Sequence, residues 1–372
     1  MKRKDGSYLN SGTISRFVFA AILFALYFIA RTVFRANPAL CGQYSEMTRA
    51  VFLLMSGALS YVKFAVAEVL VYLLFAVAGI YVAVMIYKIC TAGHVWARIA
   101  RMLSNVAALY AVLLVLFFAL YGPAYSQPPL SEQLGLETES VSTADVHKLR
   151  ALTEYMQDCA NTYADLVPRD ISGSCEFGSF DTLSALTVRA FESAEPKYSI
   201  LSGPYAPVKV PANKGLLNTL GLTGIFVPFT GEAVVNDQAP AVSLVFTMAH
   251  EMSHRLSIAP EDEANFLAFL VCRESSDRRA NYSGYFMAYR YCISALGAVD
   301  SAASGEINAG VGENLSRDLA EYKDFALSCS GLVSSISEKV NDSYLKAQGQ
   351  PSGTASYGAL VDLLLAEYAD IL

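Results

Sequence analysis

The residues with the clearest chemistry lie in one segment, FTMAHEMSHRLSIAPEDEANFLAFL, which covers residues 246–270. His250 and His254 are four positions apart, and Glu251 directly follows the first of them. In a helix, side chains at this spacing lie on one face, one turn apart, so both imidazoles can bind a single zinc ion. Glu251 would lie about 100° around the helix, from where it can reach a zinc-bound water. The pattern predicts two zinc ligands and the general base of a hydrolase.

Two histidines on a helix can also be ordinary core residues whose hydrogen bonds are satisfied within the protein. The apolar residues between positions 242 and 252 do predict a buried helix, because they are distributed nearly all round it. The chain has only four histidines, however, and two of them fall at this spacing with a glutamate in place. We therefore favour the metal site over simple core packing.

A catalytic zinc ion takes three protein ligands and leaves one position open. The two remaining histidines, His94 and His147, are far from the segment in sequence, so we expect a carboxylate as the third ligand. The acidic run Glu261, Asp262 and Glu263 follows a short turn after the histidine helix. Acidic side chains are favoured near helix N-termini, so some of these residues are expected only to stabilise the start of a second helix.

Asn265 lies four residues after Glu261, on the same face of this second helix. A side-chain amide there could orient a histidine ligand from outside the coordination shell. This placement favours Glu261 as the third ligand, and Glu263 remains the alternative.

These residues need a framework, and the C-terminal part of the chain predicts a helical one. Between residues 198 and 236, glycine, proline and β-branched residues alternate, which is typical of short strands. Helical spacing predominates before this stretch and again from Pro240 nearly to the end of the chain. We predict a mainly α protein with an α+β, mostly helical zincin-like metallopeptidase domain and a small strand region before the histidine helix.

The N-terminal part has a different composition and predicts a membrane domain. Hydrophobic residues make up 54% of the chain and charged residues 16%, and the apolar excess lies towards the N-terminus. Three runs are long enough to cross a bilayer as helices, namely 14–34, 65–87 and 102–122. A weaker apolar run, 50–62, is interpreted as an interfacial or re-entrant helix, with a fourth span as the alternative. The predicted organisation is a transmembrane domain at 1–122, a linker at 123–142 and the metallopeptidase domain at 143–372.

Lysine and arginine residues predict the orientation of these spans, since they are enriched in cytoplasmic loops. They place the N-terminus in the cytoplasm and the C-terminal domain outside, in what we expect to be a bacterial cell membrane. The basic residues on which this orientation rests are Lys2, Arg3, Lys4 and Arg16 at the N-terminus and Lys88, Arg98 and Arg101 between the second and third spans.

The net charge of -7 and the lack of a basic cluster outside these membrane flanks argue against a nucleic-acid partner.

The order of these motifs resembles an uncharacterised bacterial membrane family, domain of unknown function 3810, whose members have three N-terminal spans followed by an HExxH domain. The pieces that carry the resemblance are LYGPAY, FVPFTGEAVVN, FTMAHEMSHRLSIAPEDEANFLAFLVC, YSGYFMAYRY and VNDSYLKAQGQPSGTASYGALVDLLL. The spacing of the acidic run also resembles the second zinc helix of gluzincin-type metallopeptidases such as thermolysin-like peptidases, and that of type 1 CAAX prenyl proteases. In those families the first glutamate is the ligand, which by position is Glu261 here. The resemblance implies a zinc peptidase with no known substrate.

Two further stretches are candidates for the lining of the site. In zinc peptidases of this type, the strand before the zinc helix binds the substrate backbone, so the resemblance implies that Glu232 and Asn236 contact substrate. The segment NYSGYFMAYRY, residues 281–291, offers Tyr285 and Tyr289 as donors to the oxyanion that develops on a scissile carbonyl. The alternatives are an ordinary surface strand in the first case and helix packing in the second.

The sequence thus predicts a membrane-anchored zinc metallopeptidase with one zinc ion and an unidentified peptide or protein substrate. Glu251 would take the proton of the attacking water and pass it to the leaving amine. The alternative is a non-catalytic membrane sensor or scaffold with a structural zinc ion, which would require a fourth protein ligand; Cys272 is the nearest cysteine. An intramembrane protease is disfavoured because the apolar run 239–249 is too short to span a bilayer.

Overall fold

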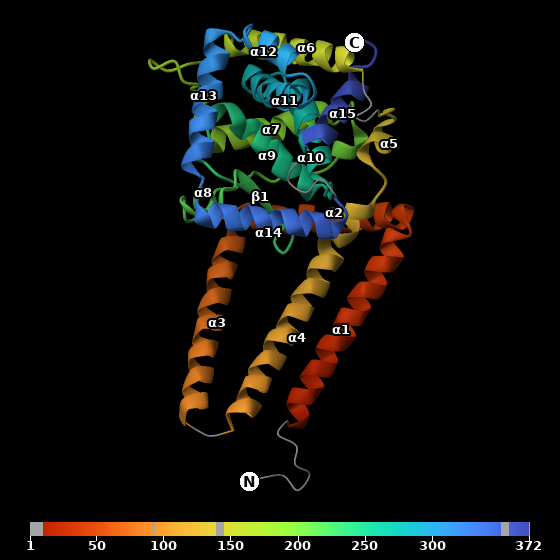
Figure 1. Ribbon diagram of the computed structural model, residues 1–372, viewed down its shortest axis with the longest axis vertical. Coiled ribbons are helices and arrows are strands. Elements are labelled where there is room, and N and C mark those ends of the chain that lie inside the picture. The colour runs from red at the N-terminus through yellow and green to blue at the C-terminus, as the bar shows by residue number, and fades with distance from the viewer. Residues whose placement is uncertain (1–9, 92–93, 139–144, 351–356, 372) are drawn as a thin grey trace. The chain divides into compact units, whose positions relative to one another are not determined.

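The computed structural model describes residues 10–91, 94–138, 145–350 and 357–371 and is mainly helical, with a two-stranded sheet. The chain divides into two compact units, which are described separately below (Figure 1). Unit 1 consists of Met1–Ser45 and Val66–Gln127, and unit 2 consists of Glu46–Ala65 and Pro128–Leu372.

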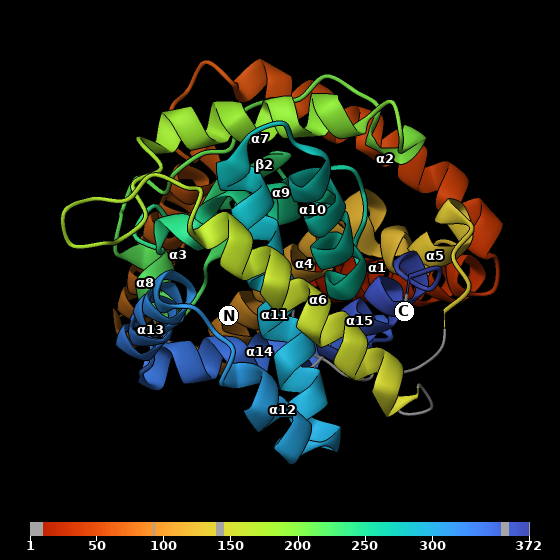
Figure 2. The ribbon, with the colours of Figure 1, turned by 90° about the horizontal axis from the view of Figure 1, so that it is seen from above.

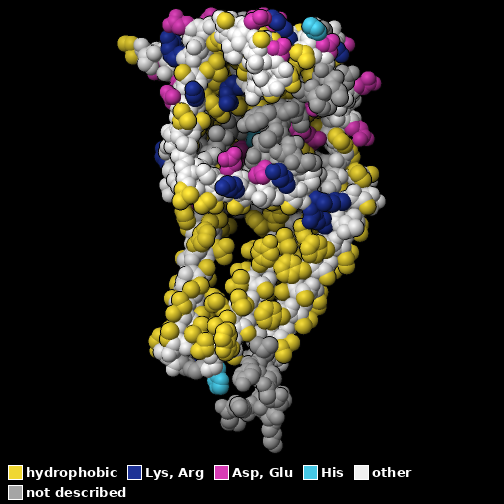
Figure 3. Space-filling view, in the orientation of Figure 1, with side chains coloured by type: hydrophobic (Ala, Val, Ile, Leu, Met, Phe, Trp, Pro, Cys, Tyr) yellow, Lys and Arg dark blue, Asp and Glu magenta, His cyan; other side chains and the backbone are white. Residues whose placement is uncertain are grey.

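Unit 1 is built from apolar helices. α1 (Ser11–Arg35), α3 (Val66–Thr91) and α4 (Val95–Tyr121) are each long and apolar enough to cross a membrane, and they overlap the three predicted spans. α1 packs on α4, with the ring of Tyr27 5.3 Å from that of Phe118. Many large hydrophobic side chains of these helices are exposed, and on the face drawn in Figure 3 acidic side chains gather on unit 2. A surface of this kind is stable only in an apolar solvent such as lipid.

The basic residues expected between the second and third spans lie on the helix ends. Lys88 is in the last turn of α3, and Arg98 and Arg101 are near the start of α4. The helices therefore extend beyond the apolar runs that predicted them. Residues 92–93, between the two helices, lie outside the described part of the chain.

α2 (Pro38–Leu59) is a continuous helix of 22 residues that begins before the predicted run 50–62. Its residues up to Ser45 cluster with unit 1 and the remainder with unit 2. Within unit 2, the ring of Phe52 lies 5.1 Å from that of Phe226. The segment 46–65, which the sequence placed in the membrane domain, thus packs on the C-terminal domain, because its buried aromatic residue has its partner there.

Unit 2 has α9, α10 and α11 at its centre. Thirteen of the 15 residues of α9 are buried, as expected for a helix that is apolar nearly all round. α6 lies across α11, and α7 packs against both α9 and α10 (Figure 2). The helices of this unit are α5 (Leu130–Leu134), α6 (Val146–Ala164), α7 (Phe180–Ala194), α8 (Leu216–Leu220), α9 (Ala241–Arg255), α10 (Glu261–Glu274), α11 (Arg278–Val299), α12 (Ser301–Asn308), α13 (Glu313–Ser328), α14 (Leu332–Gln348) and α15 (Tyr357–Glu367), with a 3-10 turn, η2, at Ser199–Leu201.

The predicted strand region is an antiparallel hairpin of β1 (Gly224–Val227) and β2 (Glu232–Val235). Gly231, with a φ of 66°, closes the turn in the left-handed conformation that favours glycine. On its other side, β2 forms a parallel bridge through Val234 to Lys209. Among the described residues, β1 pairs with β2 alone, so its other side is an edge of the sheet.

The predicted linker 123–142 contains regular structure. A 3-10 helix, η1 (Gly122–Ser126), follows α4, and α5 comes shortly after it. Leu130, at the start of α5, is fully buried in the core of unit 2. The end of the linker, residues 139–144, lies outside the described part of the chain.

Candidate metal centre

Two helices and the turn between them bring the candidate ligands together. α9 begins after Pro240 and ends at Arg255, and α10 begins directly after Pro260. Ser257 has a φ of 63°, an uncommon left-handed conformation for a residue other than glycine, which reverses the chain within a few residues. The first turn of α10 therefore faces the last turns of α9.

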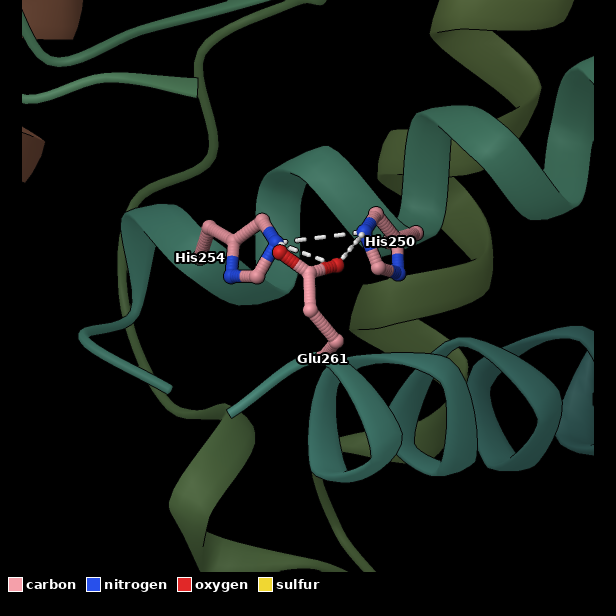
Figure 4. A group of neighbouring side chains, drawn as sticks. All are labelled: His250, His254 and Glu261. Atoms are coloured by element: carbon pink, nitrogen blue, oxygen red, sulfur yellow. Dashed lines mark hydrogen bonds and ion pairs between the residues drawn. The ribbon is translucent and has the colours of Figure 1, made fainter. Parts of the chain in front are cut away.

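The side chains of His250, His254 and Glu261 converge at this junction (Figure 4). The Nε2 atoms of the two histidines are 3.1 Å apart. Oε2 of Glu261 lies 3.3 Å from Nε2 of His250 and 3.7 Å from Nε2 of His254. Tetrahedral coordination at zinc–ligand distances near 2.0–2.1 Å would separate two ligand atoms by about 3.3 Å. The three atoms are thus spaced as ligands of one small cation would be.

The protonation of His254 supports the same conclusion. Its Nδ1 lies 2.7 Å from the carbonyl oxygen of Ile258. A carbonyl only accepts hydrogen bonds, so Nδ1 carries a proton and, in the neutral ring, Nε2 presents a lone pair to its neighbours. This lone pair points towards the carboxylate of Glu261, and two such atoms repel each other unless a proton or a metal ion lies between them.

Electrostatics within the triad follow from this arrangement. Burial by itself lowers the pKa of His254, but the adjacent carboxylate of Glu261 outweighs burial and raises that pKa to about 9. Burial favours the neutral form of Glu261, yet the two histidines hold its pKa well below the usual range. The site thus favours a positive charge between these side chains. Nδ1 of His250 is buried and has no hydrogen-bond partner among the described residues.

Glu251 lies beside this group. It is buried, and burial raises the pKa of its carboxyl to about 6. Gly224 of β1 comes so close that a Cβ atom there would lie 2.5 Å from Oε1 of Glu251. The absence of a side chain at Gly224 is therefore what lets β1 pass next to the predicted base.

The structure brings Glu261, and not Glu263, to the histidines. Oε1 of Glu263 accepts a hydrogen bond of 2.9 Å from the backbone N–H of Leu130, and Glu263 is not part of the metal-binding group. Burial raises the pKa of Glu263 to about 8, so its carboxyl is largely neutral at pH 7. Its position favours a structural role at the contact between α10 and α5.

The two residues expected to contact substrate from the hairpin are buried in other interactions. The carboxylate of Glu232 forms an ion pair of 2.7 Å with Lys209, and both side chains are almost completely buried. The Oδ1 atom of Asn236 accepts a hydrogen bond of 3.1 Å from the backbone of Gln238, and its amide donates to Asn218. Both residues stabilise the hairpin and the turn after it, so we no longer assign them to substrate binding.

The tyrosines expected to stabilise an oxyanion lie in the helical core. The ring of Tyr285 stacks on that of Tyr163, with centroids 5.5 Å apart. The hydroxyl of Tyr289 donates to Asn308 at 2.8 Å. These contacts are the helix packing that was the alternative for this segment, and we do not retain either tyrosine as an oxyanion donor.

Asn265 is half-buried and makes no hydrogen bond to a histidine among the described residues. The group that orients His254 is instead the backbone carbonyl of Ile258. The role of this atom could not be predicted from the sequence, because a backbone carbonyl leaves no signature in residue types.

The turn that carries Ile258 is itself supported from outside the motif. The hydroxyl of Thr48, on α2, lies 3.3 Å from that of Ser257, and both residues are buried. A contact across 209 positions of sequence has no local signal, and only the fold reveals that α2 supports the loop between α9 and α10.

Comparison with known proteins gave one family match. A family model described as "Protein of unknown function (DUF3810)" matches residues 44–365. Searches of curated proteins and of solved structures each found no match.

Proposed function

We propose that this chain, which belongs to the family described as protein of unknown function (DUF3810), is a membrane-anchored, zinc-dependent peptidase. The family description gives no activity, so the proposal rests on the site. The observation that carries it is the convergence of two imidazole nitrogens and one carboxylate oxygen within 4.8 Å of one another, with Glu251 beside them.

The donor set fits a catalytic zinc ion better than a structural one. Two histidines and one carboxylate are typical of zinc hydrolases, in which the fourth position is open. Among the described residues, the group has three members, and the cysteine considered as a fourth ligand, Cys272, is fully buried in the core. The side chain of Glu261 is 29% exposed, so the group can be reached from solvent. These features favour the peptidase over the sensor or scaffold.

Glu251 is the residue proposed to move the proton. A zinc ion at this site would lower the pKa of a bound water towards 7 and polarise the scissile carbonyl. Glu251, whose pKa is raised to about 6 by burial, is ionised at neutral pH and still basic enough to accept a proton from the attacking water. It would then deliver that proton to the amine of the leaving peptide.

The outer edge of β1 is the proposed binding site for the substrate backbone. β1 lies next to Glu251 at Gly224, and no other described strand pairs with the outer edge of β1. An extended peptide added to it would form main-chain hydrogen bonds while its scissile bond lies near the base. Because these hydrogen bonds are to the main chain, this mode of binding allows many different side chains in the substrate.

The placement of the domain outside the cytoplasm is also part of the proposal. It rests on the basic residues near the N-terminus and at the facing ends of α3 and α4. A bacterial cell membrane and an extracytoplasmic substrate protein are the setting that this orientation implies.

The test compares cells that carry the parent protein with cells that carry Glu251→Gln. Glutamine keeps the size of the side chain but cannot accept the proton, so zinc content should be unchanged while cleavage is lost. Mass spectrometry of protein N-termini in the membrane and extracytoplasmic fractions should reveal termini that disappear in the variant.

Glu313→Gln, at an exposed position at the start of α13, provides the matched control and should leave these termini in place. Identical sets of termini in the parent and the Glu251→Gln cells would refute the peptidase and leave the scaffold as the better account.

A further inference from the structure

α14 has an apolar face that the described residues of unit 2 leave exposed. Leu332, Val333, Ile336 and Val340 lie within an arc of about 100° on this helix. They are exposed by 79%, 48%, 55% and 64%, respectively. Charged residues, among them Glu338 and Asp342, occupy the opposite face. A helix of this kind is stable when its apolar face contacts another apolar phase.

α2 has a second uncovered apolar face. Met47, Val51 and Leu54 follow one another along one side of the helix and are exposed by 55%, 39% and 75%. A different face of α2 is buried in unit 2 through Phe52 and Thr48. The exposed face is therefore not the one that holds the helix in place.

Chain connectivity identifies what covers α2. Pro38, its first residue, follows α1 after two residues, and residues 60–65 join its end to α3. A stretch of six residues can reach at most about 20 Å. Both neighbours are helices able to cross a membrane, so a bilayer crossed by them would lie close to both ends of α2.

α14 lies at the same end of unit 2 as α2 (Figure 1), and the view from above shows the two helices on opposite sides of the unit (Figure 2). Two separated apolar faces at one end of a domain can contact a single plane. Lys339, which is exposed, lies on the side of α14 next to its apolar face, where its long side chain can extend to lipid headgroups.

We infer that unit 2 rests on the bilayer surface through the apolar faces of α2 and α14, which insert among the lipid headgroups. The acidic and basic residues of α14 balance, so the binding depends on apolar contact and not on anionic lipid. The inference does not depend on the metal centre or on peptidase activity.

The experiment uses the full chain in phosphatidylcholine nanodiscs. A benzophenone amino acid replaces Ile336 in one variant and Leu54 in another, and the control carries it at Glu338, on the opposite face of α14. After illumination, mass spectrometry should find lipid adducts at positions 336 and 54 and not at 338. A variant at Val340 repeats the measurement should the Ile336 variant fold poorly.

Three results would overturn the inference. Adducts from position 336 to a second copy of the chain would make α14 a dimer contact. Adducts to another part of the same chain would show that the face is covered internally. A lack of lipid adducts at both 336 and 340 would mean that the face is in water.

Discussion

His254 shows how a backbone atom can prepare a side chain for the metal ligation proposed here. The carbonyl of Ile258, 2.7 Å from Nδ1, fixes both the orientation of the ring and the position of its proton. Ser257, the residue before Ile258, has a left-handed conformation. Metal-binding histidines commonly use such a partner, and it increases the basicity of the nitrogen that faces the ion.

The choice between the two glutamates predicts a difference in metal affinity. Glu261→Gln should weaken zinc binding by more than about 100-fold, the upper end of the loss seen when a partner outside the coordination shell is removed. Glu263→Gln should retain zinc, because its Oε1 contacts Leu130 and a glutamine oxygen can accept the same hydrogen bond. Zinc titrations of the two purified variants against a fluorescent chelator would measure both affinities. Loss of zinc from the Glu263 variant alone would reverse the assignment.

Protons and zinc should compete for His254. Its pKa in the metal-free protein is raised from 6.5 to about 9, so the protonated ring contributes stability that is complete below about pH 6.5 and is lost as the pH rises through 9. Zinc requires the neutral ring. The increase in melting temperature on adding zinc should therefore grow between about pH 6 and pH 9.

Differential scanning fluorimetry of the detergent-solubilised protein at several pH values would measure this increase. The Glu261→Gln variant is the control and should show little response to zinc at any pH. An increase that is largest at the acidic end would contradict the proposed ligation by His254.

β1 and α9 pack closely together, and each restricts the position of the other. The close approach of β1 to the base depends on Gly224, since any larger residue would collide with Glu251. α9 in turn is held by burial on nearly every side, which prevents it from moving away. The position of Glu251 is thus set by the packing of the hairpin as well as by the helix that carries it.

Gly224→Ala should separate metal binding from catalysis. The added Cβ would lie 2.5 Å from Oε1 and 2.7 Å from Cγ of Glu251, so the carboxylate must move. A misplacement of about 1 Å can reduce turnover on the order of 100-fold. Zinc content should stay unchanged, because none of the three ligands is touched. The measurement is the rate at which the substrate found through the Glu251 comparison is cleaved.

Gly305→Ala is the matched control, since a Cβ at that position of α12 meets nothing within 4 Å. Full activity of the Gly224 variant would show that β1 does not border the reacting groups.

For the molecule as a whole, sequence patterns predicted the elements better than their contacts. The three apolar helices, the hairpin and the two helices of the HExxH segment follow from local composition and spacing, and the structure contains all of them. The association of residues 46–65 with the C-terminal unit could not be predicted, because it depends on the distant pair Phe52 and Phe226. Local patterns carry no information about such partners.

The same limit applies to the site. Spacing on one helix was enough to predict that His250 and His254 share a face, and the acidic run after the turn predicted a carboxylate nearby. Glu232 looked available on a predicted surface strand, but the structure buries it against Lys209. A charged side chain that is paired inside the protein and one that binds a ligand look alike in sequence. For Glu232 the difference lies in its partner, Lys209, which is 23 residues away.

The most direct test is the zinc K-edge absorption spectrum of the purified full-length protein loaded with one equivalent of zinc. The account predicts four nitrogen or oxygen neighbours at about 2.0–2.1 Å, with the multiple scattering of two imidazoles and no sulfur. The Glu261→Gln variant should lose this spectrum. A sulfur neighbour at about 2.3 Å, or a parent protein that binds no zinc, would contradict the proposed centre of His250, His254 and Glu261.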